Sequence, residues 1–259
     1  MHRPLYNQLV PYYEYVEGRD WQGEIRLITS ILRKHGSKSV VDLGCGTGYH
    51  ARALAGLRFE AVGIDISKQN ILYARRKAKQ EKVHPLFVVG SYYETRPDAI
   101  FDAALCLNWS IPVRDDEVKR FLDNTYSLLR PGGLLIFDYE RISEIVWSDV
   151  GKAITESWDV GGKLIVRVSV GRVVSKVLYS KDVYIIYSKP SSVTAPSEPS
   201  RYQAKGTNVQ TYVDSSTVRF FSVAEIREFA EHSGFKMIGN FMIPRKRYKR
   251  HYAVFTKTL

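Results

Sequence analysis

The chain has 259 residues, of which 44% are hydrophobic and 25% are charged. This ordinary composition excludes a wholly disordered chain, and the length suits one α/β domain with an insertion. No apolar run approaches the roughly 20 residues that span a bilayer, no signal peptide is evident, and two cysteines are too few for a disulfide framework. We therefore expect a cytoplasmic protein with no membrane association.

The 38 basic residues exceed the 27 acidic ones by 11, which suggests an anionic partner without identifying it.

The first 140 residues alternate apolar and amphipathic stretches. Five short apolar stretches predict buried strands at residues 39–43, 59–66, 86–90, 99–107 and 134–139. Helices are predicted at residues 20–35 (Asp20 as N-cap, Gly36 after the end), from Ser67 to about residue 82, and from residue 115 or 116 to the stop at Pro131-Gly132-Gly133. Such alternation predicts a parallel sheet with right-handed crossovers.

The pattern changes after residue 142. Residues 158–188 are rich in Val, Ile and Tyr and partly alternate, which predicts antiparallel hairpins with turns at Gly161-Gly162 and at Gly171. Residues 189–208 are rich in Pro and Ser and predict a long loop. A strand at 209–214, a helix after the capping box of Ser222 and Glu225, and strands at 235–243 and 251–258 complete the chain.

Residues 42–48 read D-L-G-C-G-T-G, between a predicted strand and a predicted helix. Glycines there allow backbone N–H groups to approach a ligand, and a helix N-terminus attracts negative charge. Asp65, at the end of the next strand, stands where a carboxylate accepts bonds from ribose hydroxyls. The pattern predicts an adenosine-containing cofactor. The spacing differs from the dinucleotide-binding G-x-G-x-x-G because the third glycine would fall at Tyr49, which argues against a dehydrogenase.

With these motifs, the sequence resembles the class I S-adenosylmethionine-dependent methyltransferases over nearly the whole chain, in their small-molecule branch (methyltransferase domain 25/11-like). The first two motifs of that family are similar to VVDLGCGTGYH and VGIDIS, and its strand-4 and strand-5 motifs are similar to FDAALCLN and LLRPGGLLIFD. The N-terminal segment and the final helix of the branch resemble YNQLVPYYEYV and RFFSVAEIREFAEHSGF.

The resemblance implies an α/β, Rossmann-like, seven-stranded and mostly parallel sheet with helices on both faces and a late antiparallel β insertion. Residues 1–141 and 218–259 would form the methyltransferase domain, and residues 142–217 would be a β-rich cap over the acceptor site. The implied activity is methyl transfer to nitrogen or oxygen of a small molecule by direct displacement.

S-adenosyl-L-methionine is the implied cofactor. Asp42 would orient its ammonium group, the backbone of residues 44–48 would meet the amino-acid and ribose portions, and Asp65 would bind the ribose. Ser91 departs from the family pattern because an acidic residue often stands there. The residues expected to contact the cofactor are Tyr6, Tyr13, Asp42, Gly44, Cys45, Gly46, Gly48, Asp65, Ile66, Ser91, Tyr92 and Leu107.

The family has no single fixed catalytic residue, so only acceptor-side candidates can be named: Tyr13, Asn108, Trp109, Tyr139 and Arg219. Simple packing would equally explain Trp109 and Tyr139, and Arg219 is also compatible with a surface ion pair. Tyr6 and Tyr13 would either close over the cofactor as a lid or fasten the N-terminus. The six histidines show no ligand spacing, so no metal site is expected.

Two alternatives remain open at this point. The basic run Arg245, Lys246, Arg247, Lys249 and Arg250 is compatible with a solvated turn or with capture of an anionic acceptor. The second use would suit an RNA methyltransferase, for example one acting on tRNA. A cofactor-binding accessory subunit without catalysis is the non-enzymatic alternative. Cys45 is interpreted as packing, and Cys106 lacks the context of a covalent cysteine. The chain is expected to be a monomer or a homodimer.

Overall fold

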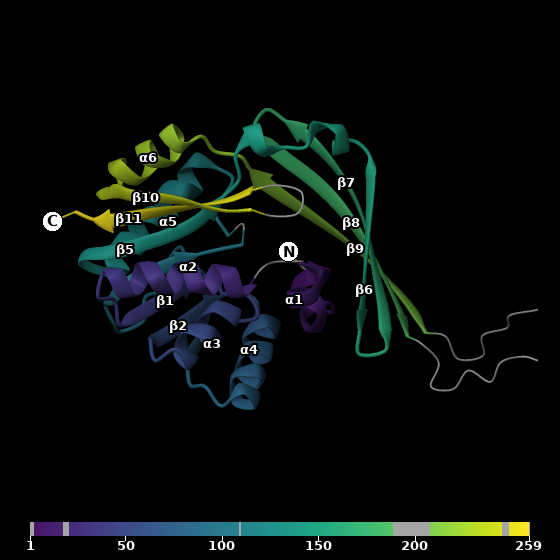
Figure 1. The fold of residues 1–259 in the computed structure, drawn as a ribbon, viewed down its shortest axis with the longest axis horizontal. Helices are drawn as coiled ribbons and strands as arrows, with labels where there is room; N and C mark the ends of the chain where they lie inside the picture. Colours follow the sequence, from purple (N-terminus) through teal and green to yellow (C-terminus); the bar gives the residue numbers. More distant parts are fainter. Residues whose placement is uncertain (1–2, 18–20, 109, 189–207, 245–248, 259) are drawn as a thin grey trace, which may run out of the picture.

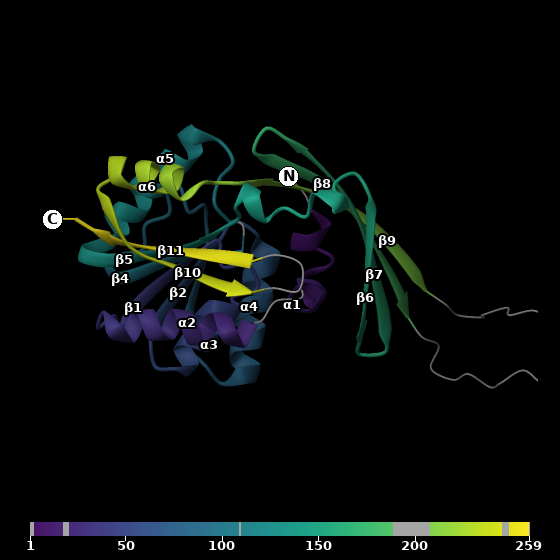
Figure 2. The same ribbon diagram turned by 45° about the horizontal axis from the view of Figure 1, so that its top comes forward.

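The computed structural model describes residues 3–17, 21–108, 110–188, 208–244 and 249–258. A seven-stranded sheet forms the body, in the order β10-β11-β5-β4-β1-β2-β3 (Figures 1 and 2). Its strands are β1 (Ser39–Leu43), β2 (Glu60–Asp65), β3 (Leu86–Val89), β4 (Phe101–Cys106), β5 (Leu129–Tyr139), β10 (Phe235–Pro244) and β11 (Lys249–Lys257). Strands β1 to β5 are mutually parallel, and β11 is antiparallel to both β5 and β10. The predicted Rossmann-like, mostly parallel sheet is confirmed.

Five helices cover the two faces of this sheet. They are α2 (Trp21–Lys34), α3 (Tyr49–Gly56), α4 (Lys68–Glu81), α5 (Asp115–Leu128) and α6 (Val223–His232). Alternate residues of one strand serve opposite faces: Val40 packs into the cluster that contains residues of α2, α3 and α4, whereas Val41 packs into the cluster with α5 and α6. The burial of both faces explains why the strands read as near-continuous apolar runs.

The helix ends follow the predicted capping chemistry. Ser67 accepts a hydrogen bond from the Asn70 N–H at the start of α4, and Ser222 and Glu225 form the capping box of α6. Gly36 adopts φ +67° after α2. The proposed N-cap Asp20 lies outside the described residues. The stretch Pro131-Gly132-Gly133, expected to end a helix, instead belongs to β5, because α5 already ends at Leu128 and the chain becomes extended at Leu129.

The insertion is a four-stranded antiparallel sheet, which we call the cap sheet. Its strands, in order, are β6 (Ala153–Val160), β7 (Lys163–Val174), β8 (Val177–Ser188) and β9 (Val209–Arg219). Gly161 and Gly162 form the predicted first turn, with φ +57° and +77°. The turn predicted at Gly171 is wrong: this glycine pairs with Ser180 inside the β7–β8 ladder. A Cβ there would stand 2.9 Å from Leu178 Cδ1, so the glycine accommodates a close side chain instead.

The N-terminal segment lies between the body and the cap sheet (Figure 1). It contains η1 (Pro4–Tyr6), η2 (Val10–Tyr12) and α1 (Tyr13–Val16), and two further short turns, η3 (Ile142–Glu144) and η4 (Trp147–Asp149), connect β5 to β6. Leu5, Leu9 and Val16 pack against Ile165 and Tyr184 of the cap sheet. The segment also contacts α4 of the body. It is therefore held from both sides.

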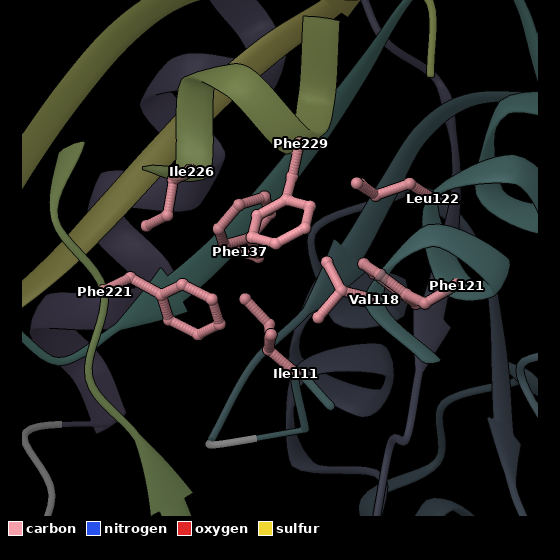
Figure 3. A pocket seen from close by; sticks show the side chains of 8 residues that line it. All are labelled: Ile111, Val118, Phe121, Leu122, Phe137, Phe221, Ile226 and Phe229. Carbon is pink, nitrogen blue, oxygen red and sulfur yellow. The ribbon is translucent and has the colours of Figure 1, made fainter. Parts of the chain in front are cut away.

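A small void lies between β5, α5 and α6. Figure 3 shows its lining, which consists of the apolar side chains of Ile111, Val118, Phe121, Leu122, Phe137, Phe221, Ile226 and Phe229. Its volume of about 10 Å³ is close to the minimum for one water molecule and far below that of a ligand site. This void is a feature of core packing.

Candidate cofactor and acceptor site

The glycine loop, residues 44–48, is held by the strand next to it. The N–H groups of Gly44 and Cys45 both donate to the Ile64 carbonyl of β2, at 2.8 and 3.0 Å. Gly44, Gly46 and Gly48 have φ values of +75°, +53° and +74°, in the left-handed region that glycine adopts without strain. The loop conformation therefore depends on these glycines and on its register with β2.

The three glycines serve different purposes. A Cβ on Gly48 would lie 2.6 Å from the Phe87 ring, and a Cβ on Gly44 would lie 2.8 Å from Ser110 Oγ. A Cβ on Gly46 would meet nothing within 4 Å. Gly44 and Gly48 thus allow the loop to pack closely against the body, whereas Gly46 faces open space where a ligand can approach the backbone.

Asp65, at the end of β2, joins the glycine loop to the start of α4. Its carboxylate accepts the N–H groups of Gly46 at 2.8 Å and Ser67 at 2.7 Å, and the side-chain amide of Asn70 at 3.4 Å. Burial raises the pKa of this carboxyl group, and the hydrogen bonds from Ser67 and Gly46 oppose the rise. A carboxylate oxygen can accept about two hydrogen bonds, and Oδ1 already accepts two, so Oδ2 keeps the capacity to accept a ribose hydroxyl.

Asp42, at the end of β1, is the least satisfied carboxylate of the site. It is 2% exposed, and its Oδ2 has no hydrogen-bond partner. Burial raises its pKa to about 6, and the nearby Asp65 adds to the rise, while His50 opposes it. A buried carboxylate oxygen without a donor is costly, and a bound ammonium group would relieve that cost. Asp42 is therefore suited to a cationic ligand group.

The residues expected around the adenine lie in different environments. Ile66 is 77% exposed directly after Asp65, an unusual position for an isoleucine. Ser91 Oγ accepts the Tyr93 N–H at 3.3 Å within a turn. The Tyr92 ring packs edge-on against Phe121, and its hydroxyl donates to the Ser110 carbonyl at 2.8 Å. Tyr92 thus braces the chain after β4, and its contact with adenine stays a prediction.

Cys45 and Leu107 are buried, at 7% and 2% exposure. A Cβ on Gly63 would lie 2.8 Å from the Cys45 sulfur, so the thiol fills the space beside β2. Burial raises the pKa of the Cys45 thiol well above its usual range, which disfavours the nucleophilic thiolate. These contacts agree with the interpretation of Cys45 as a packing residue.

Tyr6 and Tyr13 both reach the carboxyl edge of the seven-stranded sheet. The Tyr6 carbonyl accepts the Ser67 hydroxyl at 2.9 Å, next to Asp65. The Tyr13 hydroxyl accepts a hydrogen bond from the side-chain amide of Asn108, after β4. The structure therefore brings Tyr13 and Asn108 together at the edge where the cofactor is expected.

Two other acceptor-side candidates have structural partners of their own. Tyr139 is 3% exposed and shares hydrogen bonds with the Asn240 side chain. Arg219 donates to the Val113 carbonyl at 3.1 Å, pairs with Asp115, and lies 4.7 Å from the centre of the Phe221 ring. The alternative interpretations, packing for Tyr139 and an ion pair for Arg219, match these contacts. Trp109 lies outside the described residues.

The basic run does not form a continuous exposed rim. Arg250 is 1% exposed and donates to Asp138 Oδ2 at 2.5 Å, so this residue fits neither the solvated turn nor the capture of an anionic acceptor. Lys249 is exposed and lies 4.0 Å from Glu144. Arg245, Lys246 and Arg247 lie outside the described residues. The reason is that Arg250 is the second residue of β11, and its side chain packs into the body.

A cavity of about 690 Å³ lies between the N-terminal segment, the connection after β5 and the inner face of the cap sheet. Its walls include Trp158, Phe220 and Val16 together with hydroxyl groups of the cap sheet. The described lining residues include two arginines, Arg141 and Arg167, and five carboxylates: Glu17, Glu140, Glu144, Asp149 and Glu156. The sequence predicted an acceptor site under this insertion but named none of these lining residues. The signal for the cavity was the alternation Ile154, Glu156, Trp158 along β6, which places a carboxylate and two apolar side chains on one face.

Two features are absent from the described parts of the chain. None of their helices has the length and apolarity that a membrane span requires. Nor do these residues contain a cluster of three or more His, Cys, Asp or Glu side chains suited to a metal ion.

Comparison with known proteins places this site in a family. Residues 40–133 match the family described as a methyltransferase domain. Glycine N-methyltransferase of the mouse (Mus musculus) is 29% identical over 134 residues, which cover 46% of each chain. The chain spans about half the length of the curated relatives it matches.

Solved structures are similar over nearly the whole chain. The sugar N-methyltransferase KedS8 from Streptoalloteichus is 19% identical, with a TM-score of 0.75 over 96% of this chain and 93% of that chain. CalS10, an amino pentose methyltransferase from Micromonospora echinaspora solved with S-adenosylmethionine, is 17% identical, with a TM-score of 0.74 over 100% of both chains. At these identities the likeness concerns the fold, including the cap sheet. Residues 40–133 therefore carry the methyltransferase domain, and the fold of the chain is that of the class I S-adenosylmethionine-dependent methyltransferases.

Proposed function

We propose that this protein transfers a methyl group from S-adenosylmethionine to a nitrogen or oxygen of a small molecule bound in the cavity under the cap sheet. In this proposal, residues 1–141 and 218–259 form the methyltransferase domain, and residues 142–217 form the inserted cap. The observation that carries the proposal is the unpartnered Oδ2 of buried Asp42, which adjoins the glycine loop and Asp65 at one sheet edge.

The residues present fit the cofactor at each of its parts. Asp42 suits the ammonium group of the methionine portion, because the carboxylate is buried and lacks a donor on Oδ2. The open backbone at Gly46 suits the portion that joins the amino acid to the ribose, and Asp65 suits the ribose hydroxyls. The exposed Ile66 would offer an apolar surface to the adenine.

The cavity favours a small acceptor over a polynucleotide. Its volume of about 690 Å³ lies in the usual range for small-molecule sites. Five carboxylates against two arginines in the described lining disfavour the anionic acceptor that the overall charge suggested, and they disfavour RNA. An amine suits this lining best. Two proteins of similar fold, the sugar N-methyltransferase KedS8 and the amino pentose methyltransferase CalS10, support the same choice.

Methyl transfer of this kind requires alignment more than it requires a dedicated catalytic group. When bound, S-adenosylmethionine supplies an electrophilic methyl group whose carbon–sulfur bond breaks as the acceptor's lone pair forms the new bond. The glycine loop, Asp42 and Asp65 would fix the direction of that methyl group, and the walls of the cavity would orient the acceptor and exclude water. A protonated amine must also lose a proton, and a carboxylate of the cavity lining would be the group to accept it.

Calorimetric titration with S-adenosylhomocysteine, the demethylated product, tests the proposal without an acceptor. We expect measurable binding by the natural chain and a loss of about 1–3 kcal/mol in Asp65→Ala, the usual cost of losing hydrogen bonds to a charged group. Asp102→Ala is the matched control. Asp102 also accepts two backbone N–H groups, from Lys38 at 2.7 Å and Ser39 at 2.9 Å, but at the opposite edge of the sheet. Equal losses in both variants, or no binding by the natural chain, would reject the proposed site.

A further inference from the structure

Asn108 has an unusual backbone conformation just after β4. Its φ of +65° lies in the left-handed region, which costs energy for residues other than glycine, although asparagine tolerates it better than most. Its N–H donates to Asp138 Oδ2 of β5 at 2.9 Å. The conformation of the chain after β4 therefore depends on a carboxylate of the neighbouring strand.

That carboxylate is in turn held by Arg250. Both side chains are 1% exposed, and Arg250 Nη1 lies 2.5 Å from Asp138 Oδ2. The same nitrogen lies 3.5 Å from Asn108 Oδ1, and Nη2 lies 3.7 Å from Glu140 Oε1 in the lining of the cavity. One buried guanidinium thus contacts the residue after β4, the end of β5 and the edge of the cavity. Removing one partner of such a pair leaves the other charge buried and uncompensated.

The chain of contacts continues to the N-terminal segment. The side-chain amide of Asn108 donates to the Tyr13 hydroxyl, and the Tyr6 ring lies 6.3 Å from the Tyr13 ring. Tyr6 is tied through its carbonyl to Ser67, two residues after Asp65. We use the term cofactor edge for the carboxyl edge of the seven-stranded sheet, where the cofactor is expected. A change at Arg250 can therefore affect the position of the N-terminal segment at the cofactor edge.

We propose that Arg250 is a positioning residue, which holds Asn108 through Asp138 so that the amide of Asn108 fixes Tyr13 and the N-terminal segment over the cofactor edge. The guanidinium contact with Glu140 extends this network to the acceptor cavity. The purpose we give to the network rests on the proposed function, but its existence can be tested without any acceptor.

Hydrogen–deuterium exchange of the ligand-free full chain is the first test. In Arg250→Met, we expect faster exchange in peptides that contain the Asn108 amide and residues 4–16, with unchanged exchange in α2. Arg250→Lys can keep one bond to Asp138 and should restore part of the protection. Unchanged exchange at Asn108 in Arg250→Met would overturn the proposal. So would a uniform increase over the whole chain in both variants, because a purely stabilising ion pair would produce that result.

Asn108→Gly is a second variant that avoids the burial of an unpaired charge. Glycine adopts the same φ without strain and keeps the N–H bond to Asp138, but it lacks the amide that reaches Tyr13. We expect it to retain protection at residue 108 and to lose protection in residues 4–16. Retained protection in both places would also contradict the proposed link.

Titration with S-adenosylhomocysteine then tests the coupling. We expect Arg250→Met and Tyr13→Phe each to weaken binding, by about 10-fold and about 3-fold, as for the loss of one or two hydrogen bonds. The double variant should be no weaker than Arg250→Met alone, because both changes break one network. If the double variant weakened binding by the product of the two single effects, the positioning role would be overturned. Absence of binding by the natural chain would instead refute the proposed function, and the exchange results would still decide the role of Arg250.

Discussion

The seven-stranded sheet and the cap sheet differ in how they use their two faces. In β1 and β4 almost every residue is buried, because helices cover both sides. In β6 exposed and partly buried residues alternate strictly, because only one face of the cap sheet is covered. The body thus offers a rigid edge whose backbone can form a cofactor site, and the cap offers one wall of a cavity. This division would let side chains of the cap sheet change without disturbing the glycine loop and the strand ends of the body.

The glycine loop provides the prediction with the largest expected effect. Gly48→Ala would place a Cβ 2.6 Å from the Phe87 ring and 2.8 Å from the Ala74 Cβ at a φ of +74°. We expect it to lower the free energy of unfolding by about 2–4 kcal/mol through overpacking and backbone strain. Chemical denaturation measures this loss.

Gly46→Ala is its matched control, because the φ there is also positive but nothing lies within 4 Å of the added Cβ. We expect a loss of stability of only about 1–2 kcal/mol from the backbone, but a severe loss of cofactor affinity, since the methyl group would occupy the ligand's space. Equal stability losses in the two variants, with affinity preserved in Gly46→Ala, would contradict the division of roles between these glycines.

Asp42 provides the second prediction. Asp42→Asn should weaken S-adenosylhomocysteine binding by about 1.5–3 kcal/mol, the worth of a hydrogen bond to a charged group. The same change should stabilise the ligand-free protein at neutral pH, because it removes a buried carboxylate oxygen without a donor. Opposite signs for affinity and stability distinguish a ligand-binding residue from a structural one.

The pH dependence follows from the same carboxyl group. Its pKa in the folded protein is raised to about 6, above the ordinary value of 3.8, so the folded state holds this proton more tightly than the unfolded state. The contribution of Asp42 to stability is therefore lost as the pH rises from about 4 to 6. Cofactor affinity should instead increase as the pH rises and should be weaker at pH values below about 6, because the ammonium group requires the ionised carboxylate. Titrations at pH 5 and pH 7.5 measure this, and an unchanged affinity would exclude Asp42 from the ammonium site.

Arg219 provides the prediction with the smallest expected effect on binding. It ends β9 and joins the cap sheet to the start of α5 through Val113 and Asp115. Arg219→Ala should lower the free energy of unfolding by about 1–2 kcal/mol, from the lost hydrogen bond and ring contact. The affinity for S-adenosylhomocysteine should change by less than about twofold, since none of these contacts involves the glycine loop, Asp42 or Asp65. A larger change in affinity would show that the cap and the cofactor edge are not independent.

Local sequence patterns were sufficient to predict most of the body. Asp42, the glycine loop and Asp65 lie within 24 consecutive residues, so their spacing alone fixes their relation in a β-α-β unit. The capping box of Ser222 was equally local.

Long-range pairing determined the features that the sequence did not reveal. In the sequence, Arg250 belongs to a basic run. Only the pairing of β11 with β5 brings it to Asp138, 112 residues away. The cavity likewise forms only because Glu17 of the N-terminal segment and Glu156 of the cap sheet, which are far apart in the sequence, line the same space. Gly171 was misjudged because a glycine that accommodates Leu178 inside a ladder has the same sequence signal as a turn glycine.

A crystal structure with S-adenosylhomocysteine bound would show where the cofactor lies relative to the cavity. We predict the ammonium group within hydrogen-bond distance of Asp42 Oδ2, the ribose at Asp65, and the sulfur facing the cavity under the cap sheet. A sulfur turned away from that cavity, or a ligand that leaves Asp42 untouched, would contradict this prediction.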